Sequence, residues 1–452
     1  MADFAKYFPI LDMAKQAGFS RAEVFVSSSE AFSVSVYDGK VEDLSVETRS
    51  GIALRGLLNG QMGYAATEAE GTEAYEELVR AALENAQLLE SRDEQFLYDG
   101  EEALTWTRAV DESLLSVSAE EKIALAREME RLCKAADSRV TRATTCEVGT
   151  VISNCMILNT EGLRRTFSDG MAYAAAEPVL SDGTQQYSGV SFGFSRSFAD
   201  LSAEEIAREA VEKAAATIGA VSMPSGSVPV VLAPAAVRTL LSTFGGVFSA
   251  ESCQRGLSLL AGKEGETIAA PVVTLLDDPS DGLGLAGRPF DGEGVPTRKK
   301  AVIDKGVLTT LLYNLKTAHK AGKTSTGNAS RPSHLATVGT APTNFYIAPG
   351  DNAPEALYAA AGEGVRIDEL QGAHAGANPI SGDFSLAAKG VRIRGGKLAE
   401  PVNQITVSGN FYRLLEGVAA VGSDLKFGVP GAAAMGAPSL LVNGLSIAGK
   451  DE

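Results

Sequence analysis

One stretch of the chain has the spacing of a zinc peptidase site but lacks its ligands. A helix of the HExxH type carries two histidines four residues apart on one face, and the glutamate between them is the general base. In the helix expected to begin at Pro234, the corresponding positions are Ser242, Thr243 and Gly246. A hydroxyl is a poor zinc ligand, glycine supplies none, and threonine is no base near neutral pH. The sequence therefore predicts neither a metal site nor a catalytic residue on this helix.

Hydrophobic spacing predicts the elements that carry these positions. Residues 228–232 are rich in valine and leucine and follow the breakers at 224–226, which is typical of a buried strand. Pro234 then suits the first turn of a helix, where its missing N–H costs nothing. The apolar residues that recur every three or four positions predict the buried face of that helix: Val237, Leu240, Leu241, Phe244 and Phe248.

A second candidate for chemistry is a serine nucleophile. Residues 189–193 match G-x-S-x-G, a motif that exposes its serine when a strand, a tight turn and a helix follow one another. Residues 194–198 instead have the pattern of a continuing strand. We therefore interpret Ser191 as a sheet residue and keep hydrolysis through Ser191 as an alternative.

Two loop motifs match ligand sites only in part. Residues 282–287 read G-x-G-x-x-G after a strand, but Arg288-Pro289 follows instead of the helix that would bind a pyrophosphate. Asp277, Asp278 and Asp281 resemble a calcium loop, but its twelfth position is Arg288 rather than glutamate. The sequence therefore predicts a flexible, solvated acidic loop.

The three histidines, His319, His334 and His374, are scattered, and none has a histidine or cysteine at a ligand-like spacing. We interpret them as hydrogen-bonding residues and predict no cofactor, although a metal site built from all three stays open.

The densest group of polar residues is the glycine-punctuated segment 290–298. It forms either a surface turn with a local ion pair or the rim of a cleft that binds a peptide or a partner chain. The candidates for substrate binding or for a cleft rim are Asp291, Glu293, Arg298, Asn328 and Asp383.

Composition excludes several classes of protein. The 452 residues carry a net charge of −17, and the best basic cluster is residues 298–300, so direct nucleic-acid binding is not expected. No apolar run approaches the roughly 18 residues of a membrane span. The four cysteines are too widely spaced for C-x-x-C pairs, and the first residues lack the pattern of a secretory signal. We expect a soluble, cytoplasmic protein with reduced cysteines.

The first half of the chain predicts a mixed α and β lobe. A helix at 7–16 precedes hairpins that turn at Asp38-Gly39 and Asn59-Gly60, and an amphipathic helix follows at 73–89. Ser118 and Ser202 begin capping boxes and hence two further helices. Between these helices, residues 143–198 predict a second antiparallel sheet, with turns at 160–162, 169–170 and 182–183.

The breaker-rich segment at 223–227 is the expected domain boundary, which gives an N-terminal lobe at 1–222 and a C-terminal lobe at 223–452. The second lobe is expected to contain a hairpin at 300–312, strands near 390–408 and a helix at 412–421. The predicted fold class is therefore α+β, with antiparallel sheets and packed helices in each of two lobes.

Seven stretches taken together resemble the TldD/PmbA family, historically called modulators of DNA gyrase. They span nearly the whole chain: Gly51-Ile-Ala-Leu-Arg55 with Gly60-Gln-Met-Gly63, Asn159-Thr-Glu-Gly162, Phe290-Asp-Gly-Glu-Gly294, Ser325-Thr-Gly-Asn328, Ser381-Gly-Asp-Phe-Ser385, Pro401-Val402 leading to Gly409-Asn410, and Val421-Gly-Ser-Asp424. The chain is most similar to the PmbA (TldE) branch. The resemblance implies a two-lobed α+β fold.

In the TldD branch, the resemblance implies an HExxH helix and a third zinc ligand from a cysteine near the C-terminus. This chain departs at every ligand, since its last cysteine is Cys253. The resemblance therefore implies a metal-free subunit that forms a heterodimer with a TldD-like zinc peptidase and helps to enclose unfolded peptides, and it leaves a homodimer open as well. The alternatives are a self-contained hydrolase that uses Ser191 or the pair Asp291 and Glu293, and a homodimeric peptide-binding protein.

Overall fold

The computed structural model describes residues 4–90, 93–280, 282 and 284–450. It divides into two compact units that are not continuous in sequence. The first comprises residues 1–215, 288–297 and 313–339, and the second comprises 216–287, 298–312 and 340–452. The two-lobe division at residues 222 and 223 stays a prediction, and these units differ from it because two later segments join the first unit.

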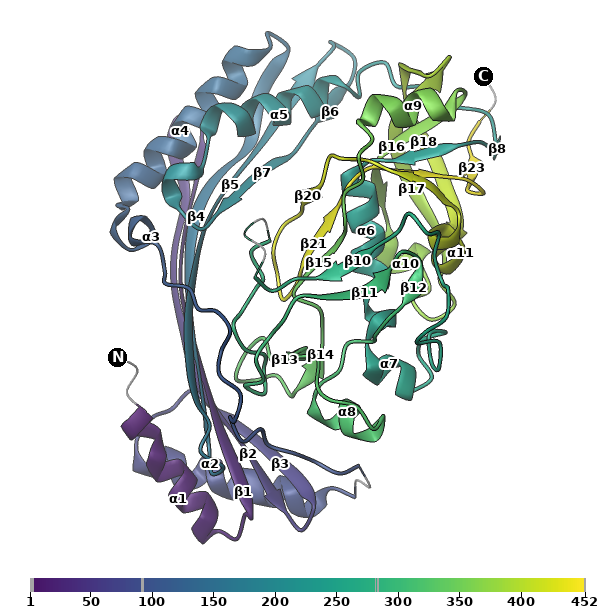
Figure 1. Ribbon diagram of the computed structural model, residues 1–452. Coiled ribbons are helices and arrows are strands. Elements are labelled where there is room, and N and C mark those ends of the chain that lie inside the picture. Colours follow the sequence, from purple (N-terminus) through teal and green to yellow (C-terminus); the bar gives the residue numbers. More distant parts are fainter. Residues whose placement is uncertain (1–3, 91–92, 281, 283, 451–452) are drawn as a thin grey trace. The chain divides into compact units, whose positions relative to one another are not determined.

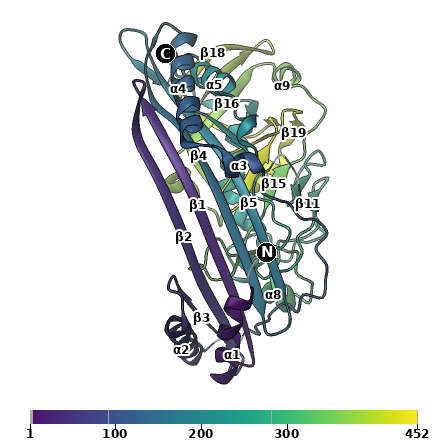
Figure 2. The same ribbon diagram turned by 90° about the vertical axis from the view of Figure 1, so that its left-hand side faces the viewer.

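The first unit is built on one seven-stranded antiparallel sheet with the order β3-β2-β1-β4-β5-β6, in which β7 also pairs with β5. The long strands β2, β1, β4 and β5 run side by side through this sheet (Figure 2). The strands are β1 (Arg21–Tyr37), β2 (Lys40–Leu58), β3 (Gln61–Thr67), β4 (Val140–Asn159), β5 (Arg164–Ser181), β6 (Gln186–Ser188) and β7 (Ser191–Ser195).

Helices cover the two ends of one face of this sheet, with α1 and α2 at one end and α4 and α5 at the other (Figure 1). On β1, Val24 belongs to the core under the first pair, and Val34 belongs to the core under the second. The helices of this unit are η1 (Phe4–Tyr7), α1 (Phe8–Gln16), α2 (Thr72–Leu88), α3 (Glu112–Ser116), α4 (Ala119–Ala136), η2 (Phe198–Asp200), α5 (Ala203–Ala215) and α8 (Leu315–Lys320).

The expectation of a second sheet in the first half is wrong. The outer edge of β1 pairs with β4, so residues 140–195 extend the sheet that the first hairpins begin. The predicted turn at Asp169-Gly170 is also wrong, because both residues lie inside β5. Gly170 serves close packing instead, since a Cβ there would lie 2.7 Å from Leu114 and 2.9 Å from Val110.

The second unit contains two mixed sheets. One has the order β12-β11-β10-β15-β21-β20, and the other has the order β19-β22-β9-β16-β17-β18-β23-β8. Each sheet holds one parallel pair, β15 with β21 and β16 with β9, so the expectation of purely antiparallel sheets is wrong for this unit. The fold class, a mixed α and β protein with several sheets, is confirmed.

Helix α6 (Pro234–Phe244) contacts strands of both sheets of the second unit, and the short helix η3 (Gly245–Phe248) continues it. Its five predicted core residues are all buried, and the Phe244 ring stacks on Phe411 at 4.8 Å between centroids. The helix expected at 412–421 is wrong beyond its first turns, because α11 ends at Glu416 and a strand follows Gly417.

The strands of the first sheet of this unit are β10 (Leu275–Asp277), β11 (Lys300–Asp304), β12 (Val307–Leu308), β15 (Asn344–Ile347), β20 (Lys426–Phe427) and β21 (Ala434–Ala437). Those of the second sheet are β8 (Gly226–Ser227), β9 (Val230–Leu232), β16 (Gly364–Gln371), β17 (Asp383–Arg394), β18 (Lys397–Asn410), β19 (Val418–Val421), β22 (Leu440–Val442) and β23 (Ser446–Ala448). The remaining elements are the short pair β13 (Ala329–Ser330) and β14 (Gly339–Thr340) and the helices α7 (Ala250–Gln254), α9 (Pro354–Ala361), α10 (Ala373–Gly376) and α11 (Phe411–Glu416). In the described part of the chain, no helix has the length and apolar content needed to cross a membrane.

Candidate functional site

The three positions that would carry a zinc motif lie at the end of α6 and in η3. Ser242 and Gly246 are exposed, and a Cβ at Gly246 would meet no atom within 4 Å. The Thr243 hydroxyl donates to the carbonyl oxygen of Thr239 at 2.7 Å, a bond typical of threonine within a helix. The helix therefore presents an accessible face whose side chains are two hydroxyls and a hydrogen atom.

The predicted polar loop at 290–298 leads to a different feature, a buried charge cluster in the first unit. The cluster consists of Glu23, Arg55, Asp291, Glu293 and Arg331, all of them buried. The register of the strands places the first two members of the cluster side by side. Glu23 on β1 lies opposite Arg55 on β2, and opposite Asn159 on β4. Side chains opposite one another across strands lie on the same face, about 5 Å apart. The sheet thus presents an acid and a base side by side on the face opposite Val24.

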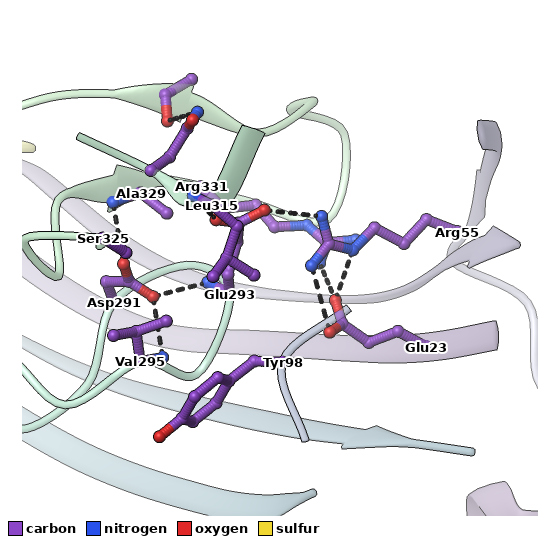
Figure 3. Close-up of polar contacts among 12 residues, drawn as sticks. Glu23, Arg55, Tyr98, Asp291, Glu293, Val295, Leu315, Ser325, Ala329 and Arg331 are labelled. Carbon is purple, nitrogen blue, oxygen red and sulfur yellow. Dashed lines mark hydrogen bonds and ion pairs between the residues drawn. The ribbon is translucent and has the colours of Figure 1, made fainter. Parts of the chain in front are cut away.

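Arg55 is the centre of the cluster (Figure 3). Its Nε and Nη2 donate to the two carboxylate oxygens of Glu23 at 2.7 and 3.2 Å, and its Nη1 donates to Oε1 of Glu293 at 3.1 Å. Burial alone would lower the pKa of Arg55, but the two carboxylates outweigh it and raise that pKa. A forked guanidinium matches carboxylates better than a lysine would, which explains the arginine at this position.

Glu293 connects the sheet to the start of α8. While Oε1 faces Arg55, Oε2 accepts from the backbone nitrogen of Leu315 at 2.8 Å. Asn314, the N-cap residue of α8, forms a capping box with Thr317. The carboxylate therefore binds an arginine of β2 and one of the backbone N–H groups that the first helical turn leaves unpaired.

Asp291 organises the loop around itself. Its Oδ1 accepts from the backbone nitrogens of Glu293 and Val295 at 2.9 and 3.0 Å, and its Oδ2 accepts from Ala329 at 2.9 Å (Figure 3). Burial and the nearby Glu293 carboxylate raise the pKa of Asp291 to about 7, against the opposing effect of the three N–H donors. Among the described residues, Asp291 is the acid of the cluster that has no hydrogen bond or ion pair with an arginine.

Arg331 completes the cluster from the segment after Ala329. Its Nη1 donates to Oε1 of Glu23 at 3.0 Å, and its guanidinium lies over the Phe25 ring at 4.3 Å from the centroid. Burial, opposed by Glu23 and assisted by Arg55, lowers the pKa of Arg331. The Glu23 carboxylate thus binds two arginines. The cluster as a whole contains two arginines and three acidic residues.

His334 fixes the same segment to the sheet. Its backbone nitrogen donates to the Ser27 hydroxyl at 3.1 Å, and its ring occupies the space that a side chain at Gly51 would need. The other two histidines have different surroundings: His319 Nε2 lies 2.9 Å from Glu94, and His374 is exposed on α10. Each histidine of the first unit therefore has its own polar partner.

The remaining motifs are accounted for by packing. Ser191 is buried and donates to Glu209 of α5 at 2.9 Å, while a Cβ at Gly189 would lie 2.4 Å from the Ala214 nitrogen. The glycines of G-x-S-x-G thus allow α5 to approach the sheet closely.

Residues 284–287 pack around Asn344, whose Oδ1 accepts from the backbone nitrogen of Ala286 at 3.0 Å. A Cβ at Gly284 would lie 2.3 Å from the Asn344 side chain, which explains that glycine without a nucleotide. Asp277 and Asp278 pair with Lys300 and Lys299 at 2.8 and 2.7 Å. Asp281, the third aspartate of the calcium-like spacing, lies outside the described residues.

Models of three successive family domains match the chain. PmbA/TldA metallopeptidase domain 1 matches residues 22–86, the central domain matches 112–218, and the C-terminal domain matches 225–449. The chain belongs to the PmbA/TldD metallopeptidase family. The resemblance inferred from the seven stretches is therefore confirmed.

Two solved structures are similar to this chain over almost their full length. A Thermotoga maritima protein named a modulator of a DNA gyrase is 33% identical, with a TM-score of 0.88 over 98% of this chain and 99% of that one. TldE from Thermococcus kodakarensis is 25% identical, with a TM-score of 0.89 over 98% and 100% of the two chains. A relative named metalloprotease, from Methanothermobacter thermautotrophicus, is 29% identical over 90% of this chain and 89% of that one.

The PmbA/TldD family name implies a metal ion, and the donor set on α6 does not fit one. Zinc sites in proteins use imidazole, thiolate or carboxylate ligands, and Ser242, Thr243 and Gly246 provide none of these. Within residues 4–90, 93–280, 282 and 284–450, no three His, Cys, Asp or Glu side chains gather as a metal site would require. We therefore assign no chemical step to a metal held by this helix.

The structure brings together three of the five predicted site residues. Asp291, Glu293 and Asn328 lie in the first unit and are buried, and Asn328 Oδ1 accepts from Thr326 at 2.7 Å. Arg298 and Asp383 belong to the second unit and are exposed, and Asp383 accepts from Asn410 at 2.8 Å. A role for these five at a cleft rim stays a prediction.

Sequence reasoning missed Glu23, Arg55 and Arg331. A signal existed for Glu23, because it alternates with Val24 and Val26 and therefore points to the opposite face of its strand. Arg55 ends one of the seven family stretches but has no local chemical signature. No local pattern marks Arg331, because its partner is 308 positions away in the sequence.

Proposed function

We propose that this chain is a PmbA/TldE-type subunit without a catalytic centre of its own. It acts with a TldD-like zinc subunit in a metallopeptidase complex that processes unfolded peptides. The observation that carries the proposal is the donor set of α6, where an accessible face presents Ser242, Thr243 and Gly246 in place of two histidines and a glutamate. Similarity to TldE over the full length supports the same conclusion.

In this proposal the buried charge cluster has a positioning role. Its carboxylates already bind arginines and backbone N–H groups, and their burial separates them from any substrate proton. Asp291 and Glu293 hold the loop that leads to the exposed Arg298. We propose that Arg298 and Asp383 contact the peptide or the partner subunit.

The test compares metal content and cleavage for the chain alone and for the complex. We expect the purified chain to bind zinc only substoichiometrically by mass spectrometry and to leave an unfolded peptide intact. Addition of the TldD-like subunit is expected to restore cleavage, whereas a partner whose HExxH glutamate is replaced by glutamine should not. Stoichiometric zinc together with cleavage by this chain alone would overturn the proposal.

A self-contained hydrolase is the alternative, and Ser191→Ala separates it from the proposal. The only hydrogen bond described for the Ser191 hydroxyl joins it to Glu209, so no histidine base contacts it in the described chain. We expect the variant complex to keep its peptidase activity. A loss of activity by Ser191→Ala but not by Ser188→Ala, on the neighbouring strand β6, would favour the hydrolase. A homodimeric peptide-binding protein is favoured if the same genome contains no TldD-like subunit.

A further inference from the structure

Half of β2 is an uncovered sheet edge. Strand β3 pairs with β2 only from Ile52 to Leu58, whereas β1 pairs with it from Lys40 onward. Residues 40–50 therefore hydrogen-bond to a neighbour on one side only among the described residues, along an edge that Figure 2 shows beside β1. Proteins usually shorten, bend or cover such edges, because unpaired N–H and C=O groups pair readily with another strand.

Apolar side chains accompany this edge. Leu44 and Val46 are 47% and 69% exposed, and they lie opposite Val34 and Phe32 of β1. Val34 is buried in the core under α4 and α5. The same face of the sheet continues onto β2, where Leu44 and Val46 lie outside that core. The pairing of β1 with β2 has a bulge near Val36. Residues 43–49 lie beyond it and form a stretch of regular pairing without a bulge.

The charges along this run and the length of the uncovered edge favour one way of pairing it with a second copy of itself. In an antiparallel pair with a two-fold axis at Val46, Asp43 lies opposite Arg49 twice and Val46 lies opposite Val46. With the axis at Ser45, Asp43 would face Glu47 twice, and with the axis at Glu47, two glutamates would face each other. Opposite charges across strands stabilise a pair and like charges destabilise it, which disfavours the axes at Ser45 and Glu47. An axis at Thr48 would also place Glu47 opposite Arg49 twice, but it would bring residue 44 opposite residue 52, where β3 already pairs with β2. The axis at Val46 keeps its attractive pairs within the longer uncovered stretch and is therefore favoured. Arg49 already contacts Glu47 at 2.8 Å, but both side chains are exposed, so breaking this ion pair to form the intermolecular one costs little free energy.

We propose that residues 43–49 of β2 are an interface for a second copy of this chain, in antiparallel pairing about a two-fold axis at Val46. The pairing joins two seven-stranded sheets edge to edge and makes the same patch face itself, as a two-fold dimer requires. It needs no TldD-like subunit, so its failure and the failure of the proposed function are separate results.

A charge exchange tests the pairing through the dissociation constant of the full-length chain, measured by sedimentation. Asp43→Arg and Arg49→Asp are each expected to weaken self-association about tenfold, since each replaces two attractive pairs by two repulsive ones. The double variant is expected to restore it, which a folding defect would not do. Glu42→Arg makes the same kind of charge change outside the run and is the matched control.

A cysteine at the axis gives an independent readout. Two copies of Val46→Cys face each other and are expected to form an intermolecular disulfide on oxidation, whereas Leu44→Cys places the two thiols about 14 Å apart along the strand and should not. A wild-type chain that is monomeric at all concentrations, single charge variants that associate normally, or cross-linking of Leu44→Cys in preference to Val46→Cys would overturn the proposal. Cross-linking of Val46→Cys to a TldD-like subunit or to a peptide instead of a second copy would also overturn it.

Discussion

Arg55 Nη1 lies 3.1 Å from Oε1 of Glu293, although 238 positions separate the two residues in the sequence. The loop at 288–297 belongs to the first unit, and this contact joins it to the sheet of that unit. Both partners are buried, and Glu23 binds the rest of the guanidinium. Loss of one carboxylate therefore leaves charge and N–H groups that water does not reach.

Glu293→Gln is expected to lower the free energy of unfolding by about 3 kcal/mol, because it breaks a buried ion pair from one side. Denaturant unfolding followed by fluorescence measures the change. Glu77→Gln is the matched control, because its pair with Arg80 is on the surface, and a change below about 0.5 kcal/mol is expected there. Equal effects of the two variants would contradict the structural role of Glu293.

The raised pKa of Asp291 gives stability a defined pH dependence. The Asp291 carboxyl has a pKa of about 7 in the folded state and about 4 in the unfolded state, so the folded chain keeps this proton to a higher pH. Its contribution to stability is therefore complete below about pH 4 and is lost as the pH rises to about 7.

Asp291→Asn removes this titration, so the wild-type chain is expected to lose stability relative to the variant as the pH rises from about 4 to about 7. Unfolding midpoints at a series of pH values measure the difference. Asp137→Asn serves as the control, because the hydrogen bond from Arg139 holds the pKa of Asp137 at about 2, below this range. Parallel pH profiles for wild type and Asp291→Asn would refute the assignment.

Gly189→Ala is expected to destabilise the chain by about 1–3 kcal/mol, because the added methyl group would overlap backbone atoms of α5 that have little room to move. Gly246→Ala adds the same atom where nothing lies within 4 Å, and a change within about 0.5 kcal/mol is expected. Thermal unfolding of both variants measures the contrast. If Gly189→Ala were as stable as wild type, the packing explanation of the G-x-S-x-G motif would fail.

The open face of α6 also predicts that metal ligands are tolerated there. The triple variant Ser242→His, Thr243→Glu, Gly246→His is expected to fold and to bind Co²⁺ with visible absorption, since histidines at i and i+4 project from one helical face. Ser242→Ala, Thr243→Glu, Gly246→Ala is the control and should not bind. A folded triple variant without metal affinity would show that this face is unsuited to a metal.

Local features of the fold were predictable from sequence. Asp38-Gly39 and Asn59-Gly60 form the two tight turns with positive φ angles, and Ser118 caps α4 as its spacing indicates. Strand length was not predictable, because residues 29–31 and 47–50 lack regular alternation, yet pairing with neighbours on β1 and β4 extends the strands through them.

The candidate site was predictable only where its residues cluster in the sequence. Asp291 and Glu293 stand two positions apart between glycines, which marked their loop. Whether that loop is exposed or buried depends on Glu23, Arg55 and Arg331, which arrive from distant segments. Local chemistry identified the acids, whereas only the tertiary structure reveals that both are buried and that Glu293 pairs with Arg55.

The continuity of β1 has a mechanical consequence for the first unit. Val24 and Val34 anchor the same strand in two separate hydrophobic cores, one beneath each pair of helices. Neither core can melt without releasing hydrogen bonds that the other relies on, so the unit should lose its structure in a single cooperative step. The pairing of β1 with β4 runs without a register shift from Glu23 to Ser35 and therefore connects the two cores directly.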